Sequence, residues 1–173
     1  MPRTRVRPWR WLRWLLTAGL VGFLIFAAMV ASWSNSEPAD LEQAQAKFAA
    51  KLQELGSAPP YIDQDDVGRS FLHTELENPR SPIRLAELHA MVWLAESEEL
   101  LQTHVPMWFV RIKDAGGNGL SLLLSVVEWD LDDLQLELDV AALERRGPAL
   151  LLDRRKADGS RLLIWSSATS ESP

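Results

Sequence analysis

Residues 120–140 read LSLLLSVVEWDLDDLQLELDV, and apolar residues recur at every second position along much of this stretch. They occupy odd positions up to Leu131 and even positions from Leu134 to Val140, so the alternation changes phase at Asp132 and Asp133. A turn at these two aspartates restores one continuous apolar face, because it places Leu131 opposite Leu134. The stretch is therefore predicted to be a β-hairpin of strands 120–131 and 134–140.

The second face of this predicted hairpin carries carboxylates. The same register places Glu128 opposite Glu137, and like charges directly opposite each other destabilise a strand pair unless they are hydrated or neutralised. Two interpretations remain open: a solvated acidic face, and a calcium ion held by Glu128, Asp130, Glu137 and Asp139. The solvated face is favoured, because the stretch lacks the Asp-x-Asp-x-Asp-Gly loop of an EF-hand. No metal and no cofactor is therefore expected.

The remaining elements follow from apolar spacing, capping residues and turn residues. Helices are predicted at 40–55, around 66–77, at 82–102 and at 140–146. Further strands are predicted at 107–114, 149–156 and 161–167. Gly147 ends the last helix, and Gly159 supplies the positive φ of the turn between the last two strands. The sum is an α+β domain in which helices pack on a five-stranded, mostly antiparallel sheet.

Residues 14–33 read WLLTAGLVGFLIFAAMVASW and contain no charged residue. About twenty residues, rising 1.5 Å each, are needed for a helix to cross a hydrocarbon layer of about 30 Å. The stretch is therefore predicted to be a single transmembrane helix. The alternative is a cleaved signal peptide, with Val30 and Ser32 before the cut. The apolar run is longer than the roughly 7–15 residues of a signal-peptide core, so a retained anchor is favoured.

Charge changes sign across this stretch. Five arginines precede it, whereas the residues that follow include 13 basic and 24 acidic ones, a net charge of −11. Lys and Arg are enriched on the cytoplasmic side of membrane spans. We therefore expect the N-terminus in the cytoplasm and the rest of the chain outside it, anchored in the inner (plasma) membrane. The arginines are Arg3, Arg5, Arg7, Arg10 and Arg13.

Four tryptophans lie at the two ends of the predicted span, in positions typical of rings at a membrane interface: Trp9, Trp11 and Trp14 at the inner edge and Trp33 at the outer one. The chain thus divides into a basic cytoplasmic tail, a transmembrane helix, a membrane-proximal helix with its linker, an extracytoplasmic α+β domain and a frayed tail. Their predicted ranges are 1–13, 14–33, 34–60, 61–168 and 169–173.

No catalytic motif is found. His73, His89 and His104 have no metal-ligand spacing, and a chain without cysteine has no disulfide and no thiolate nucleophile. The acidic outer part would be repelled by nucleic-acid phosphates, so nucleic acid is not an expected partner.

One concentration of basic residues stands out in the acidic outer part: Arg145, Arg146, Arg154, Arg155, Lys156 and Arg161. Such a cluster binds an anion or an acidic partner surface in some proteins. The alternative, which is favoured, is ion pairing within the domain, with Asp153, Asp158 or the carboxylates of residues 128–139.

Three functions are consistent with these features. The first is a non-enzymatic, single-pass membrane protein whose outer domain binds another envelope protein or serves as a structural subunit, with the lipid bilayer as partner of residues 14–33. The second is a sensor of a small ligand, which requires an apolar pocket between helix 82–102 and the sheet. The third is a membrane-tethered hydrolase, which requires a histidine within hydrogen-bond reach of a serine or a carboxylate.

Overall fold

The computed structural model describes most of the chain after residue 31. Of the predicted membrane span, only Thr17, Ala28, Ser32 and Trp33 are described, and the first two are helical. The rest of the span lies outside the described residues, and no helix within them is long and apolar enough to cross a membrane. The chain divides into two compact units, Met1–Ser34 and Asn35–Pro173. The described residues are Thr17, Ala28, 32–56, 59–64, 70–114 and 140–168.

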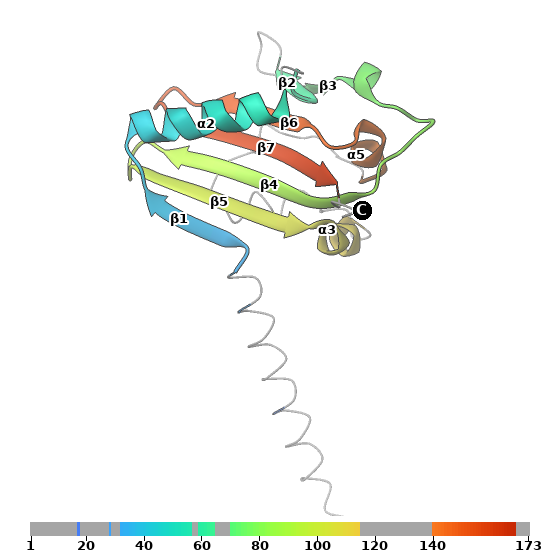
Figure 1. Cartoon of the computed structure of the whole chain (residues 1–173), viewed down its shortest axis with the longest axis horizontal. Helices are drawn as coiled ribbons and strands as arrows, with labels where there is room; N and C mark the ends of the chain where they lie inside the picture. The colour runs from blue at the N-terminus through green and yellow to red at the C-terminus, as the bar shows by residue number, and fades with distance from the viewer. Residues whose placement is uncertain are drawn as a thin grey trace, which may run out of the picture. The chain divides into compact units, whose positions relative to one another are not determined.

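The second unit is built on a five-stranded antiparallel sheet in the order β1-β5-β4-β7-β6, as Figure 1 shows. A separate pair, β2 and β3, is also antiparallel. The strands are β1 (Ser34–Pro38), β2 (Ile62–Gln64), β3 (Ser70–Leu72), β4 (Leu85–Leu94), β5 (Glu99–Pro106), β6 (Leu150–Arg155) and β7 (Arg161–Ala168). The helices are α2 (Leu41–Leu55), α3 (Met107–Asp114), α5 (Val140–Arg146) and the 3-10 turn η1 (Thr74–Leu76).

Helix α2 covers one face of the sheet. Asp40 caps its N-terminus, because the Asp40 side chain accepts a hydrogen bond of 2.8 Å from the Gln43 N–H, and Gly56, with φ of +80°, caps its C-terminus. Ala44 and Phe48 are each 1% exposed, and they pack with a set of sheet residues in one cluster. That set is Met91, Trp93, Leu100, Leu150, Leu163 and Trp165. Burial of this apolar face holds α2 on the sheet.

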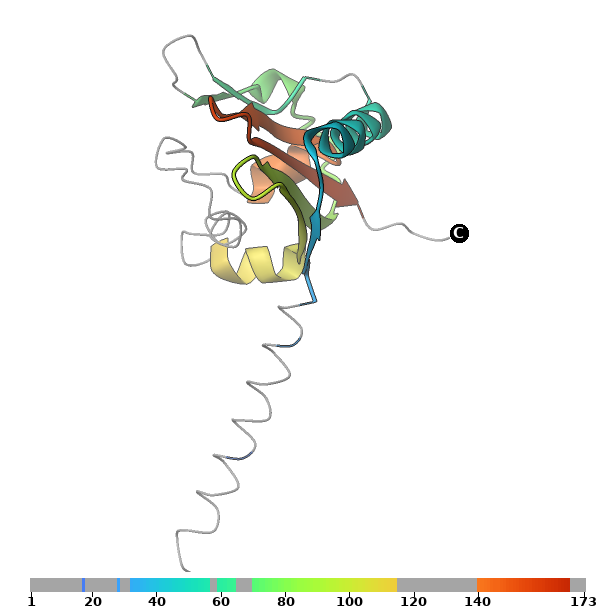
Figure 2. The same cartoon turned by 90° about the vertical axis from the view of Figure 1, so that its left-hand side faces the viewer.

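The opposite face of the sheet is also buried in its centre. Leu88 and Val92 of β4 and Leu162 of β7 are fully buried, as is Met107 at the start of α3. Figure 2 shows α2 on one side of the sheet and α3 on the other. The central strands β4 and β7 therefore contribute apolar residues to two layers.

The predicted helix at 82–102 is wrong, because this segment forms β4 and β5. The two strands pair antiparallel, with Val92 opposite Leu101 and Trp93 opposite Leu100. Apolar residues point to both faces of β4, so the run is nearly continuous and its period does not separate a strand from a buried helix. The connection between the strands includes Glu98 with φ of +49°.

The predicted strand at 107–114 is also wrong, because these residues form α3. Met107 and Val110, three residues apart, are buried, whereas Trp108 and Ile112, four residues apart, are exposed. That spacing is the one expected of an amphipathic helix. The helix predicted around 66–77 is wrong at β3, and among the residues of that range that the structure describes, 70–77, only η1 is helical. Strand β1 was not predicted, since its sequence SNSEP has no large apolar residue.

Four predicted elements are confirmed, namely α2, α5, β6 and β7. Gly147 after α5 and Gly159 in the turn before β7 both have positive φ, +76° and +93°. The α+β class and the five-stranded sheet are confirmed, although three of its strands are not those predicted. The predicted hairpin of strands 120–131 and 134–140 lies outside the described residues.

Candidate functional site

Three aromatic rings meet on the α2-covered face of the sheet, beyond its apolar centre. His89 of β4 lies opposite Trp165 of β7 and opposite His104 of β5. The rings of His89 and Trp165 are stacked, with centroids 5.1 Å apart and an angle of 4° between their planes. The His104 ring centroid lies 6.2 Å from that of His89. The strand register therefore brings these three rings together from three strands, with His89 and Trp165 stacked.

Polar groups approach His89 at a single nitrogen. Its Nε2 lies 3.0 Å from Ser167 Oγ and 3.4 Å from Glu87 Oε2. In a serine hydrolase the carboxylate and the serine lie on opposite ring nitrogens, so that the carboxylate fixes the tautomer used by the serine. Glu87 and Ser167 instead share Nε2. This arrangement hydrogen-bonds the ring but does not give Glu87 the orienting role of a triad acid.

Burial lowers the pKa of His89 below its usual 6.5. The carboxylates of Glu87 and Glu54 oppose that shift, whereas His104 and the Lys51 ammonium reinforce it. At neutral pH the imidazole is therefore neutral, and it donates or accepts one hydrogen bond at Nε2 according to its tautomer.

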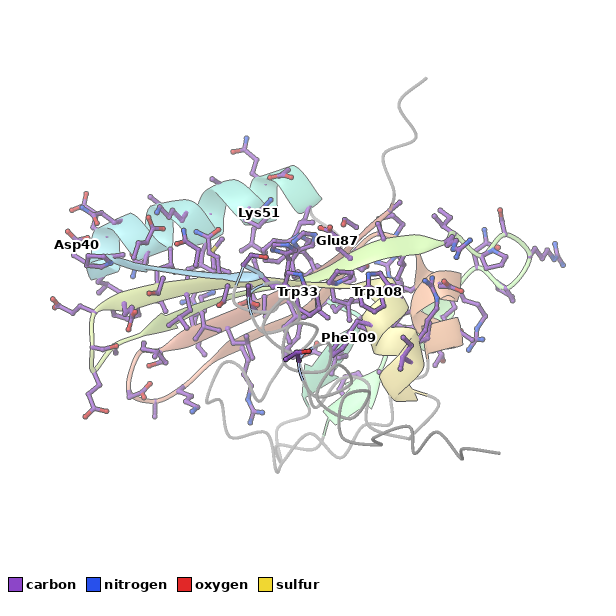
Figure 3. All side chains as sticks on the ribbon, turned by 90° about the horizontal axis from the view of Figure 1, so that it is seen from below. Trp33, Asp40, Lys51, Glu87, Trp108 and Phe109 are labelled. Carbon is purple, nitrogen blue, oxygen red and sulfur yellow. The ribbon has the colours of Figure 1, made fainter. Side chains whose placement is uncertain are left out.

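Lys51 of α2 contacts this group of rings from the helix side. Its Nζ lies 5.0 Å from the centroid of the Trp165 ring, within the range of a cation–π contact. Figure 3 shows Lys51 on α2 and Glu87 on β4. We name the six residues that share these contacts the His89 cluster: Lys51, Glu87, His89, His104, Trp165 and Ser167.

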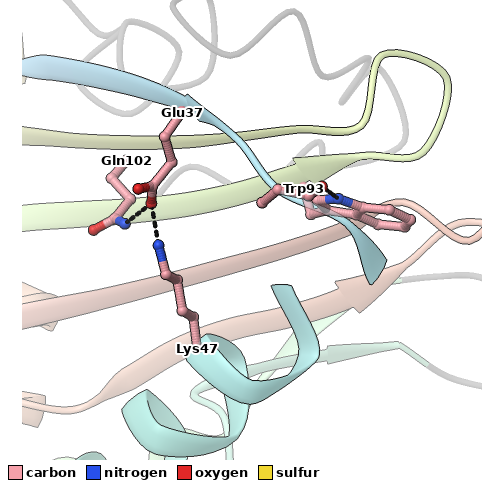
Figure 4. A network of polar contacts seen from close by, with 5 residues as sticks. Glu37, Lys47, Trp93 and Gln102 are labelled. Atoms are coloured by element: carbon pink, nitrogen blue, oxygen red, sulfur yellow. Dashed lines mark hydrogen bonds and ion pairs between the residues drawn. The ribbon is translucent and has the colours of Figure 1, made fainter. Parts of the chain in front are cut away.

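A second polar network ties β1 and α2 to the sheet. Glu37 of β1 forms an ion pair with Lys47 of α2 and accepts a hydrogen bond of 3.3 Å from Gln102 Nε2 of β5, as Figure 4 shows. The indole N–H of the buried Trp93 donates to the Ala39 carbonyl oxygen at 3.0 Å. These contacts fix the segment between β1 and α2, and with it the position of α2 over the sheet.

The structure separates the predicted basic cluster into two groups, at opposite ends of β6. Arg145 of α5 lies beside the start of the strand, where its Nε is 2.5 Å from Glu77 Oε2. The same carboxylate accepts a hydrogen bond of 2.5 Å from the hydroxyl of Tyr61, which is completely buried. Burial, followed by the Glu77 contact, raises the pKa of Tyr61 well above its usual value. Arg145 is thus neutralised within the domain.

The second group lies at the far end of β6. Arg161 donates two hydrogen bonds to Asp153, from Nε at 2.9 Å and from Nη2 at 2.6 Å, and its guanidinium lies 4.8 Å from the centroid of the Phe48 ring. Arg161 is therefore paired with Asp153 within the domain. Arg155 is exposed and lies opposite Arg161 in the strand register. The remaining members of the cluster are Arg146, Arg154 and Lys156.

Most of the other predicted site residues lie outside the part of the chain that the structure describes. These are the four acidic residues considered as calcium ligands, the five N-terminal arginines and three of the four interface tryptophans. Trp33 is described, and its side chain is 8% exposed. Among the described residues, no group of three or more His, Cys, Asp or Glu side chains is arranged to hold a metal.

The His89 cluster was not predicted. Its members come from α2, β4, β5 and β7, and His89 and Ser167 are 78 residues apart in the sequence. Only the register of β4 with β7 brings them together, and β4 was predicted to be helical. Recognising β4 as a strand would have placed His89 and Trp93 on one face with Met91.

Comparisons with protein-family models, curated proteins and solved structures found no match to this chain. Function must therefore be inferred from its own residues and geometry.

Proposed function

We propose that the chain is a non-enzymatic, single-pass membrane protein whose acidic outer domain binds another protein of the cell envelope. The observation that carries the proposal is the asymmetry around residues 14–33. Five arginines precede that uncharged stretch, and all 24 acidic residues follow it. Such a distribution favours an N-terminus in the cytoplasm and a domain outside it.

The outer face of α2 is the surface to which we assign the partner. Its inner face packs on the sheet through Ala44 and Phe48. Its exposed residues include five that are small or neutral in a domain of net charge −11, while Glu42 near the start of α2 and Glu54 near its end are exposed acids. The five are Gln45, Ala46, Ala49, Ala50 and Gln53. Small side chains let a partner backbone approach closely, and the neutral residues between Glu42 and Glu54 limit the unpaired charge that a partner would bury.

Two other functions receive less support. The contact of 3.0 Å between His89 and Ser167 favours a hydrolase, but Glu87 approaches the same nitrogen as the serine instead of the opposite one. A ligand sensor was expected to hold its ligand between a helix at 82–102 and the sheet. That segment is itself part of the sheet, as β4 and β5, so the expected pocket wall is missing.

Photo-crosslinking in the native membrane tests the partner surface. A photoreactive amino acid is placed at Ala49 on α2 or, as the matched control, at Ala157 in the turn before β7. Both residues are exposed alanines. We expect a discrete adduct from position 49 and none from position 157. An added Ala46→Arg substitution should abolish the adduct, because it introduces a long charged side chain beside the crosslinker. Equal adducts from both positions, or insensitivity to Ala46→Arg, would contradict the proposal.

A further inference from the structure

Strand β1 enters the sheet directly after the predicted span, since its first residue is Ser34. It runs antiparallel to β5. The Ala39 N–H, just after β1, donates to the carbonyl oxygen of Glu98, just before β5, at 2.9 Å. Nearer the start of β1, Glu37 contacts Gln102. The start of β1 therefore lies at the end of the sheet where β5 ends and α3 begins. We call this the entry end.

Exposed apolar side chains concentrate at the entry end. Trp108 and Ile112 of α3 are 47% and 64% exposed, and Ile83, just before β4, is 47% exposed. Ile83 is held there because its N–H donates to the Glu144 carbonyl oxygen of α5 at 2.9 Å. Among the described residues, only two other large apolar side chains are exposed, Leu41 and Phe71. Leu41 lies at the opposite end, where β1 has ended and α2 begins.

Basic side chains accompany this apolar surface. Arg80 and Arg84 flank Ile83 in the segment before β4 and are exposed. Arg111 of α3 bonds inward, to the Glu144 carboxylate of α5 and, at 3.4 Å, to the Leu85 carbonyl oxygen. Because Arg111 points inward, α3 is held on α5 with Trp108 and Ile112 left outward. Aromatic and aliphatic side chains beside arginines are the composition of surfaces that bind a bilayer interface.

We propose that the entry end lies on the outer surface of the membrane, with Trp108, Ile112 and Ile83 in the headgroup region and Arg80 and Arg84 beside lipid phosphates. The inference rests on the proposed membrane anchor, because a span that ends at residue 33 leaves the start of β1 at the bilayer surface. Tethering raises the local concentration of bilayer around the entry end, so a small apolar surface is sufficient for docking. The domain is then held in a fixed orientation, with α2 and the far end of the sheet away from the lipid.

Site-directed fluorescence on the full chain in lipid vesicles tests this docking. The chain has no cysteine, so Ile112→Cys and, as control, Leu41→Cys each accept one environment-sensitive nitrobenzoxadiazole label. Both parent side chains are exposed apolar residues on a helix. An interfacial helix buries its apolar face about 5–10 Å deep, so we expect lipids with a nitroxide near the top of the acyl chain to reduce the label's emission about twofold at position 112 and not at position 41.

Alkaline extraction of the same vesicles distinguishes failure of the docking from failure of the membrane anchor, because only an anchored chain stays in the vesicles. Chain that stays in the vesicles, with quenching at position 112 alone, supports the docking. Chain that stays with neither label quenched overturns the docking and leaves the anchor intact. A blue-shifted but unquenched label at position 112 shows that protein covers α3 and likewise overturns the docking. Chain released by alkali overturns the anchor, and the docking with it.

Discussion

Replacing Phe48 by alanine is expected to lower the free energy of unfolding of the outer domain by about 3–5 kcal/mol. Phe48 is 1% exposed, and its ring joins α2 to the sheet in one cluster with Met91, Trp93 and Leu163. Its removal takes away apolar contact and leaves a cavity between α2 and the sheet. Urea denaturation of the full chain in detergent measures the loss.

Phe71→Ala is the matched control, because the same atoms are removed from a side chain that is 41% exposed. Phe71 contacts His73 edge to face, with centroids 5.1 Å apart, so its removal should cost about 1 kcal/mol or less. Equal losses for the two variants would mean that α2 does not pack on the sheet through Phe48.

Asp153→Ala is the second substitution with a large expected effect, a loss of about 3 kcal/mol in the same measurement. Asp153 accepts both hydrogen bonds of Arg161, whose side chain is 11% exposed. Without the carboxylate, a nearly buried guanidinium is left without its counter-charge between β6 and α2. The cost comes from that uncompensated charge more than from the lost pair itself.

The control for Asp153 is Glu54→Ala. Glu54 is also paired, with Lys51 at 2.6 Å, but its own side chain is 68% exposed. Exposed pairs of this kind contribute at most about 0.5 kcal/mol. A loss for Asp153→Ala no larger than that for Glu54→Ala would show that the Arg161 site is wetter than the structure describes.

The elements that could be predicted from the sequence are those with local signals at both ends. Helix α2 has Asp40 as its N-cap and Gly56 as its stop, and the strands β6 and β7 are joined by a turn with Gly159. Strand β4 has no such local signals at its ends. Leu88 and Val92 point to one buried face and Met91 to the other, so the apolar run lacks the period that distinguishes a half-buried strand.

The sequence did not predict edge strand β1 or helix α3, and the reasons differ. Serine and asparagine supply no apolar pattern in β1, which is held by its pairing with β5 and by Glu37. Helix α3 spans eight residues, too few for the period of 3.6 to stand out against the period of two. The His89 cluster could not be predicted at all, because it depends on the register of strands far apart in the sequence.

The central claim is that residues 14–33 hold the chain in the membrane and that the domain after them lies outside the cytoplasm. A phosphatase that is active only outside the cytoplasm tests it, fused either after Pro173 or before Met1. We expect activity from the first fusion and none from the second, because five arginines retain the N-terminus in the cytoplasm. Replacing those arginines by glutamate should reduce the activity of the first fusion. Activity from the fusion before Met1, with none from the fusion after Pro173, would contradict the account.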